Sequence, residues 1–402
     1  MIKYSSLNFP ENGDPIWLSI NLQRVDQWSM IFQLQNLKHV TVEPNECDWL
    51  CLGSRFLSVD NVETQKILGG LLEKVPFVVI NDLVHAEENQ HLWITKGLPD
   101  WMPKRKYLLV TNSQTKFNNP DWLEVHYYDF LFNRTKAFYT GFPFENSPWY
   151  YAGRENYQAP LVKNDGENKQ KIFLSPCRLY EDQNRTVFRR RLFDLMEKYK
   201  EDGFRSGPGR VKNGAVDKTP AGAYLESMTD DPLVNYRKLG WYYNPQKKSL
   251  NVDFEPLSKW VGSRWGGYNP IHHHYFKNSF ISIYAETIET GEMVVITEKT
   301  YDPLIKGHFI LPFGCAGLVS SIKEVGFRLP EFIRYDYDSI SDDAVRFEHY
   351  AKEVRRIMRF PEQRWCALLD ENLALLRYNQ RLFHCRDYHK LQLPFGENES
   401  TT

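Results

Sequence analysis

The sequence has no apolar run long enough to span a membrane, and its start, MIKYSSLNFPENGDP, lacks the apolar core of a signal peptide. Its net charge is only −1 over 402 residues, so a DNA contact would depend on a local basic patch. Internal repeats and long low-complexity stretches are also absent. These absences predict a globular cytoplasmic protein with no membrane span.

Paired cysteines are missing too. The six cysteines form no CxxC pair, and Cys47 and Cys51, whose spacing is compatible with a metal site, have no matching second pair. The pattern predicts reduced, mostly buried thiols in a reducing compartment. No GxGxxG motif follows the first predicted strand, which argues against an NAD-dependent enzyme.

What is present is an alternation of continuous apolar stretches with helix-like segments. Apolar strands joined by helices are typical of a parallel sheet covered on both faces, and the length suits two such cores. The predicted strands are 48–53, 75–80, 107–110, 171–175, 280–284 and 308–313, and the predicted helices are 62–74, 185–199, 318–325 and 342–382.

The composition also predicts the domain organisation. Residues 140–168 are rich in Gly, Pro, Asn and Tyr, as linkers between domains are. We therefore predict an α/β protein with two doubly wound, Rossmann-like domains, at 1–150 and 165–340, and C-terminal helices at 341–402 that pack back on them. Residues 200–270, rich in glycine, basic residues and tryptophan, are predicted to be a loop-rich insertion in the second domain.

The segment ITEKTYDPLIKGHFILPFG, residues 296–314, places adjacent opposite charges between two apolar stretches. Thr297 follows a strand-like stretch, 293–296, at a place where a helix N-terminus favours an anion. Lys299 would reach a diphosphate, and Glu298, about 100° away around the helix, would accept bonds from a ribose diol. The alternative is a capped helix start with a solvated face.

Two more predicted strands end in charged residues. The first strand of the second domain is followed by Arg178 and Arg185, whose planar guanidinium groups suit a phosphate. Arg190 and Arg191, further along the helix, are predicted to be solvated surface. The strand SFISIY delivers Glu286 to the same edge of the sheet, where its carboxylate would hold sugar hydroxyls or cap the following segment.

These three features, in this order, resemble the donor half of the fucosyltransferase-like glycosyltransferases of family ten and their bacterial, phage and large-virus relatives. In that family an arginine-bearing turn after a strand is followed by a strand that ends in Glu and then by a Thr-Glu-Lys helix start. The resemblance covers about 170–345, except for 200–270, and is looser over the N-terminal half. It implies a GT-B-like fold, with two domains that face a central cleft. It also implies a location in the cytoplasm, which would be the host cytoplasm if the chain is viral.

The resemblance also implies a nucleotide-diphosphate sugar as the donor substrate, with no cofactor. Lys299 with Arg178 or Arg185 would bind the diphosphate, Glu298 would bind the ribose, and Glu286 would line the sugar pocket. Eukaryotic members have Glu-Asn-Ser where this chain has Glu286 followed by threonine, so fucose itself is not implied. The donor-binding residues carried over are Arg178, Arg185, Glu286, Thr297, Glu298 and Lys299.

Transfer from such a donor leaves a diphosphate, whose charge these cationic groups would stabilise without a metal. An inverting reaction also needs a general base on the acceptor side. Asp82, His85 and Glu87 follow a predicted strand at its carboxyl end, so they are the catalytic candidates. For each of them the alternative is a polar loop that closes the strand.

The acceptor expected for this family is a glycan. DNA with a hydroxymethylated base is an alternative, because phage enzymes of this general architecture glycosylate it, and the basic loops 203–218 and 259–268 could contact its phosphates. A non-catalytic nucleotide- or carbohydrate-binding protein on the same fold is a third interpretation.

Two patterns imitate metal sites. Asp336-Tyr337-Asp338 matches the DxD pattern that binds manganese in other glycosyltransferases, but the polar residues after it predict a capping loop before a helix. His272, His273 and His274 are successive, so their side chains cannot all converge on one ion, and they would instead form a wall near the donor site. We therefore predict no metal ligands.

Overall fold

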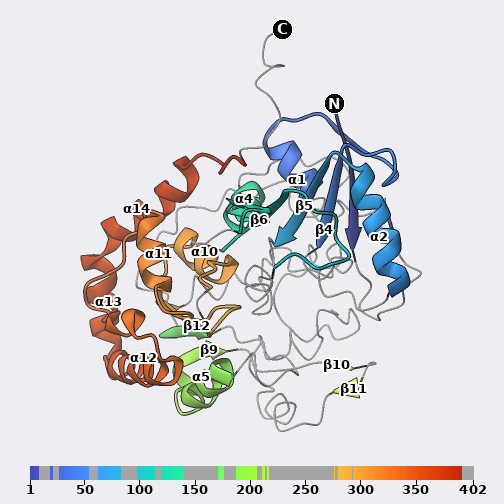
Figure 1. Cartoon of the computed structure of the whole chain (residues 1–402). Coiled ribbons are helices and arrows are strands. Elements are labelled where there is room, and N and C mark those ends of the chain that lie inside the picture. The colour runs from blue at the N-terminus through green and yellow to red at the C-terminus, as the bar shows by residue number, and fades with distance from the viewer. Residues whose placement is uncertain are drawn as a thin grey trace. The chain divides into compact units, whose positions relative to one another are not determined.

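A computed structural model describes residues 1–8, 19–20, 27–53, 62–82, 97–113, 120–139, 171–175, 187–205, 211–212, 215–216, 276, 279–291 and 293–391. The chain divides into two compact units, 1–134 with 144–147 and 387–402, and 135–143 with 148–386. Both contain parallel strands and helices, so the predicted α/β class is confirmed (Figure 1). The predicted linker at 140–168 lies outside the described residues.

The first unit is built on one sheet in the order β2-β1-β4-β5-β6-β7, with β3 also beside β1. Every pair is parallel except β1 with β2. The apolar stretches predicted as strands became β4, β5 and β6, whereas β1, β3 and β7 were not predicted. The elements are β1 Ile2–Asn8, β2 Ser19–Ile20, α1 Gln27–Leu34, β3 His39–Thr41, β4 Trp49–Gly53, α2 Val62–Lys74, β5 Phe77–Asp82, β6 Tyr107–Thr111, β7 Leu123–Tyr127 and α4 Phe130–Tyr139, the last of which crosses into the second unit.

The second unit contains a parallel sheet in the order β13-β12-β8-β9, and a short antiparallel pair, β10 with β11. All three strands predicted here are confirmed to within two residues. The elements are β8 Phe173–Ser175, α5 Val187–Glu197, η3 Lys200–Asp202, β9 Gly203–Arg205, β10 Val211–Lys212, β11 Ala215–Val216, β12 Ile281–Ala285, α10 Glu298–Ile305, β13 Phe309–Phe313, α11 Leu318–Glu324, η4 Asp336–Ser339, α12 Asp343–Ile357, α13 Glu362–Glu371 and α14 Leu373–Cys385.

Helices cover both faces of the second sheet. Alternate strand residues such as Ile283 and Leu311 are buried in one apolar cluster with side chains from α5, α12 and α13, among them Trp365. On the opposite face the hydroxyl of Tyr284 lies 2.7 Å from that of Thr300 in α10. Figure 1 shows α12, α13 and α14 following one another, in orange to red, within this unit. The unit is therefore doubly wound, as predicted.

Two positions in the second unit depend on glycine. Gly203 stands opposite Phe173 in the β8–β9 register, where a β-carbon would come within 2.2 Å of the phenyl ring. Gly307 has a φ of +70°, which lets the chain turn from α10 into β13. One expectation was wrong: residues 293–296, expected to be strand-like, are buried but belong to no strand, because no neighbouring strand pairs with them in the described sheet.

Among the described residues, no helix is long and apolar enough to cross a membrane. The described cysteines, Cys47, Cys51, Cys315, Cys366 and Cys385, are free thiols, as predicted. Cys177 lies outside the described residues.

Candidate functional site

The candidate site lies at the carboxyl edge of the second sheet, where the strand order reverses. The chain passes from β8 to β9 on one side, whereas β12 pairs with the other side of β8 and continues to β13. Ligands of open α/β sheets settle outside the carboxyl ends of the strands at such a reversal. All the predicted donor residues follow β8 or β12. Of these, Arg178 and Arg185 lie outside the described residues, two or more positions before α5.

Glu286, the first residue after β12, is completely buried, and its carboxylate organises the start of α10. It accepts hydrogen bonds from the backbone N of Thr297 at 3.1 Å, from the Thr297 hydroxyl at 2.5 Å and from the Thr300 hydroxyl at 2.6 Å. The backbone N of Thr287 adds a fourth bond at 3.2 Å. The geometry thus favours the capping alternative for Glu286, and its contact with a sugar stays a prediction.

Thr297 is the N-cap of α10, and its hydroxyl accepts a bond from the backbone N of Lys299 at 3.2 Å. The Lys299 ammonium bonds to the Thr287 hydroxyl at 2.9 Å and to the Glu298 carboxylate at 3.3 Å. The side chains of Lys299 and Glu298 are 19% and 39% exposed. The start of α10 is therefore capped by Thr297. In the same turn, the Lys299 ammonium is hydrogen-bonded to Thr287 and Glu298 and stays partly exposed. Glu298 and Lys299 are consecutive residues of α10 whose side chains form a pair, and their separate roles toward a ribose and a diphosphate stay predictions.

A second charged pair, which was not predicted, lies behind this edge. Glu289 and Arg189 are both almost fully buried, and Arg189 Nε lies 2.8 Å from Glu289 Oε1. The other carboxylate oxygen accepts bonds from the backbone N of Phe188 at 3.0 Å and of Arg189 at 3.2 Å, at the start of α5. The guanidinium also donates to the backbone O of Glu286 through Nε, at 3.2 Å, and through Nη2. This pair joins the start of α5 to the end of β12.

Burial raises the pKa of Glu289 to about 7, against the opposing effects of the Arg189 charge, the two α5 backbone bonds and the Lys299 charge. A carboxyl group with such a pKa changes its charge near neutral pH. Perturbed carboxyl groups are common at functional sites, and this pair lies directly behind the candidate edge, where it joins α5 to the end of β12.

The sequence contained a signal for Arg189 but not for its partner. Arg189 shares the spacing i, i+3, i+4, i+7 with Leu192, Phe193 and Met196, which are all buried. An arginine at an apolar position of a helix implies a buried acceptor. Arg191, by contrast, is partly exposed and pairs with Glu348 on α12, which confirms its surface assignment.

The catalytic candidates belong to the first unit. Asp82 is the last residue of β5 and stands opposite Thr111 of β6 in the strand register. His85 and Glu87 lie outside the described residues. The described part of this edge also contains the buried polar residues Asn112 and Ser113, directly after β6. The roles of the three candidates stay predictions.

The DxD pattern is a helix cap. Asp338 is buried, and its carboxylate accepts bonds from the backbone N of Val319 at 2.7 Å and from the N and hydroxyl of Ser320 at 2.9 Å. Asp342 caps the next helix, since its side chain accepts from Val345 N at 2.8 Å. The capping interpretation is therefore confirmed, although Asp338 caps α11, which precedes it. The three successive histidines, 272–274, lie outside the described residues.

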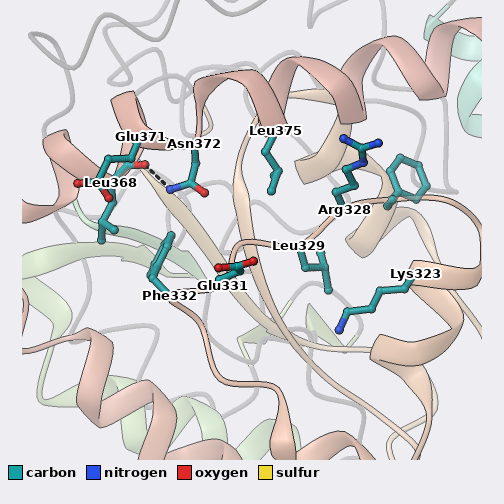
Figure 2. Close-up of a pocket in the computed structure, with 10 residues that line it drawn as sticks. Lys323, Arg328, Leu329, Glu331, Phe332, Leu368, Glu371, Asn372 and Leu375 are labelled. Carbon is teal, nitrogen blue, oxygen red and sulfur yellow. Dashed lines mark hydrogen bonds between the residues drawn. The ribbon is translucent and has the colours of Figure 1, made fainter.

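An open pocket of about 720 Å³ lies near the amino ends of the strands of the second sheet. One of its lining residues, Phe332, packs edge-on at 5.0 Å against Phe309, the first residue of β13, so the pocket lies toward the amino ends of the strands. Figure 2 shows Lys323 and Arg328 on one side of it and Glu371 on the other. The pocket is therefore separate from the candidate site, at the opposite ends of the same strands.

A scan against protein-family models found no match to this chain, and a search of curated proteins found none either. Among solved structures, an alpha,alpha-trehalose-phosphate synthase (UDP-forming) from Burkholderia vietnamiensis superposes with a TM-score of 0.31 at 10% identity. The superposition covers 89% of this chain and 66% of that one, just under two thirds of its length. At that TM-score it assigns no function to this chain.

Proposed function

We propose that the chain is a GT-B-like glycosyltransferase that moves a sugar from a nucleotide-diphosphate sugar to an acceptor hydroxyl, by an inverting reaction without a metal. The observation that supports the proposal best is the Lys299 ammonium, which is held at the reversal point of a parallel sheet by Thr287 and Glu298. Such a position suits an anionic ligand at the end of the sheet.

The position of Lys299 argues for a ligand, because it opposes a local preference. A cation in the first turn of a helix interacts unfavourably with the helix dipole, by about 0.3–1 kcal/mol. The Thr287 hydroxyl holds the ammonium close to the partly exposed edge instead of leaving it to extend into water. A bound diphosphate would compensate the unfavourable charge, and it would gain a cation that is already oriented.

In the proposed reaction Lys299 stabilises the negative charge on the departing diphosphate. Arg178 and Arg185 are proposed to assist it, and Glu298 is proposed to bind the ribose. One of Asp82, His85 and Glu87 is proposed to take the proton from the acceptor hydroxyl as the new glycosidic bond forms. The bond between the sugar and the diphosphate breaks in the same step.

The proposed acceptor is a glycan, and the enzyme is proposed to be fucosyltransferase-like without fucose being specified as the sugar. DNA with a hydroxymethylated base would bind with an affinity that falls steeply as salt rises, whereas a neutral glycan would not. A non-catalytic binding protein would bind a nucleotide sugar without hydrolysing it. Salt dependence and slow donor hydrolysis therefore separate the three alternatives.

The test is a thermal-shift panel with GDP, UDP, CDP and ADP, each with and without EDTA. A ligand at about 100 times its Kd stabilises the folded state by about 2.7 kcal/mol, so specific binding is measurable. We expect one diphosphate to raise the midpoint to the same extent with EDTA. Lys299→Ala should abolish the shift, while Lys352→Ala, at an exposed position of α12, should retain it. The absence of a shift with every diphosphate, or an unchanged shift in Lys299→Ala, would contradict the proposal.

A further inference from the structure

The buried pair behind the candidate edge, Arg189 with Glu289, has no role in the function proposed above. Arg189 connects this pair to one peptide group of the candidate edge, that between Glu286 and Thr287. The backbone O of Glu286 belongs to this peptide and accepts two bonds from Arg189. The Thr287 hydroxyl, on the other side of the peptide, holds the Lys299 ammonium at 2.9 Å.

We infer that Glu289 is a positioning residue for the proposed diphosphate site: with Arg189 it orients the Glu286–Thr287 peptide, and through Thr287 it holds Lys299. The inference rests on the proposed function for its ligand. Glu289 does not touch the ligand in this account, because its side chain is only 1% exposed. It acts through Arg189, whose Nε lies 2.8 Å from Glu289 Oε1 and also donates to the backbone O of Glu286 at 3.2 Å.

The elements around Glu289 determine how its charge affects this arrangement. From α5 it faces Arg189 and two backbone N–H groups, and from α10 it is influenced by the charge of Lys299. From α12, Arg346 Nη2 donates to the backbone O of Glu289 at 3.3 Å. The nearby Glu286 carboxylate is occupied by Thr297 and Thr300. The ionised carboxylate is therefore the form that pairs with Arg189.

This arrangement makes a neutral isostere informative. Because the pKa of Glu289 is raised to about 7, its charged and neutral forms are of similar stability in the fold at neutral pH. Glu289→Gln keeps an acceptor for the α5 backbone and should fold. It removes the charge that holds Arg189. If Glu289 is purely structural, the substitution should change only stability, whereas if Glu289 is a positioning residue it should weaken ligand binding.

The experiment compares wild-type protein with Glu289→Gln and with Glu348→Gln, the same change at the exposed partner of Arg191. Affinity for the diphosphate that gives the largest shift in the panel is measured by calorimetry from pH 6 to 8.5. At pH 8 we expect Glu289→Gln to bind about tenfold more weakly, the lower end of the loss seen when a residue that orients a metal ligand is removed. Its thermal midpoint should be no lower than that of wild type. Glu348→Gln should match wild type in affinity, with a midpoint lowered only by the small contribution of the exposed pair.

The pH profile provides a second readout. Wild-type affinity should fall, relative to that of Glu289→Gln, as the pH drops through about 7, because protonation then removes the same charge that the substitution removes. The titration of the ligand is common to both proteins. Equal affinities and parallel profiles would overturn the inference and leave the proposed function intact, and a loss of affinity only in step with a loss of thermal stability would overturn it as well.

A third readout needs no ligand. Amide hydrogen exchange in peptides that span 286–300 should be faster in Glu289→Gln at pH 8, since the peptide held by Arg189 is loosened. If wild type binds no diphosphate, the proposed function fails, and the exchange measurement alone then decides whether Glu289 positions this segment. Unchanged exchange there would overturn the inference in every case.

Discussion

Helix α10 has one lysine at each end, and the two ammonium groups differ in their exposure to solvent. Lys299, in the first turn, is partly exposed, and its ammonium bonds to Thr287 and Glu298. Lys306, at the C-cap, is fully buried, and this burial lowers its pKa to about 7, although the Asp302 charge opposes the effect. The ammonium group is therefore partly exposed at the N-terminal end of α10 and buried at the C-terminal end.

The surroundings follow the same division. Near Lys306, Gln380 of α14 donates to the backbone O of Ile305 at 2.9 Å and so caps the end of α10. Burial lowers the pKa of His384, and the charges of Lys136 and Lys306 lower it further. This end is a closed junction between helices. A cation at a helix C-terminus agrees with the helix dipole, whereas Lys299 at the N-terminus opposes it. The helix-dipole preference is violated at Lys299, as local preferences often are at functional sites, whereas the cost at Lys306 comes from burial.

The largest effect on the free energy of unfolding should come from replacing the buried Lys306. The pKa of Lys306 is about 7 in the fold and 10.5 ordinarily, so between these pH values the unfolded chain binds the proton and the folded chain does not. Stability therefore rises with pH over this range, by about 5 kcal/mol at about 1.4 kcal/mol for each pH unit. Lys306→Met should remove this rise and increase the free energy of unfolding at pH 7.

Denaturant unfolding of the whole chain at pH 7, 8.5 and 10 measures this difference between variant and wild type. Other groups titrate over the same range, but they are common to both proteins, so the difference between variant and wild type isolates Lys306. Lys352→Met provides the exposed control. Parallel pH dependences in Lys306→Met and wild type would show that the two ends of α10 do not differ in the way described.

Glu289 should produce the next largest effect, with the opposite sign. Its pKa is about 7 in the fold against an ordinary value of 4.5, so the folded chain binds the proton more tightly over this interval. The stability that it contributes is complete below pH 4.5 and is lost as the pH rises to about 7, by about 3 kcal/mol. Glu289→Gln should flatten this fall. A difference between variant and wild type that grows between pH 7 and 9 would contradict the assignment.

The sequence allowed β8, β12 and β13 of the second unit to be predicted, because they are buried on both faces and read as continuous apolar runs such as KIFLS and FISIY. The fourth strand of the sheet, β9, was assigned wrongly to the loop-rich insertion, because GFR is short and only one of its three residues is a large apolar one. The sequence also did not allow β1 to be predicted, since IKYSSLN contains two serines, of which Ser5 is completely buried in the sheet. Residues 293–296 were misassigned for the opposite reason: they are buried and apolar without a partner strand.

The site was predictable only where it is local in sequence. Thr297 and Lys299 lie within one helical turn, so the capped start and its cation could be predicted from neighbouring residues. Glu289 and Arg189 are 100 positions apart and meet only when β12 pairs with β8. Their pairing depends on tertiary structure, and so does the raised pKa of Glu289, because burial is its main cause.

A smaller effect should follow from Asp338→Ala. Asp338 resembles Glu286 in that its buried carboxylate accepts hydrogen bonds from the backbone at the start of a helix, but it does not lie at the proposed ligand site. Loss of such a cap costs about 1–2 kcal/mol. We expect urea unfolding to show this loss while diphosphate affinity stays unchanged. A manganese-dependent loss of affinity in the variant would instead favour the DxD interpretation.

The smallest effect should come from Arg191, which tests whether exposure alone accounts for the contrast between cations. Arg191 pairs with Glu348, and its guanidinium lies 4.6 Å from the centre of the Phe347 ring. Both charged side chains are about half exposed, so water screens the pair, and its contribution should be about 0.5 kcal/mol. A double-mutant cycle of Arg191→Ala and Glu348→Gln measures it separately from the ring contact. A coupling several times larger would show that exposed ion pairs in this unit resemble the buried ones, and exposure could then no longer explain why Lys299 and Lys306 differ.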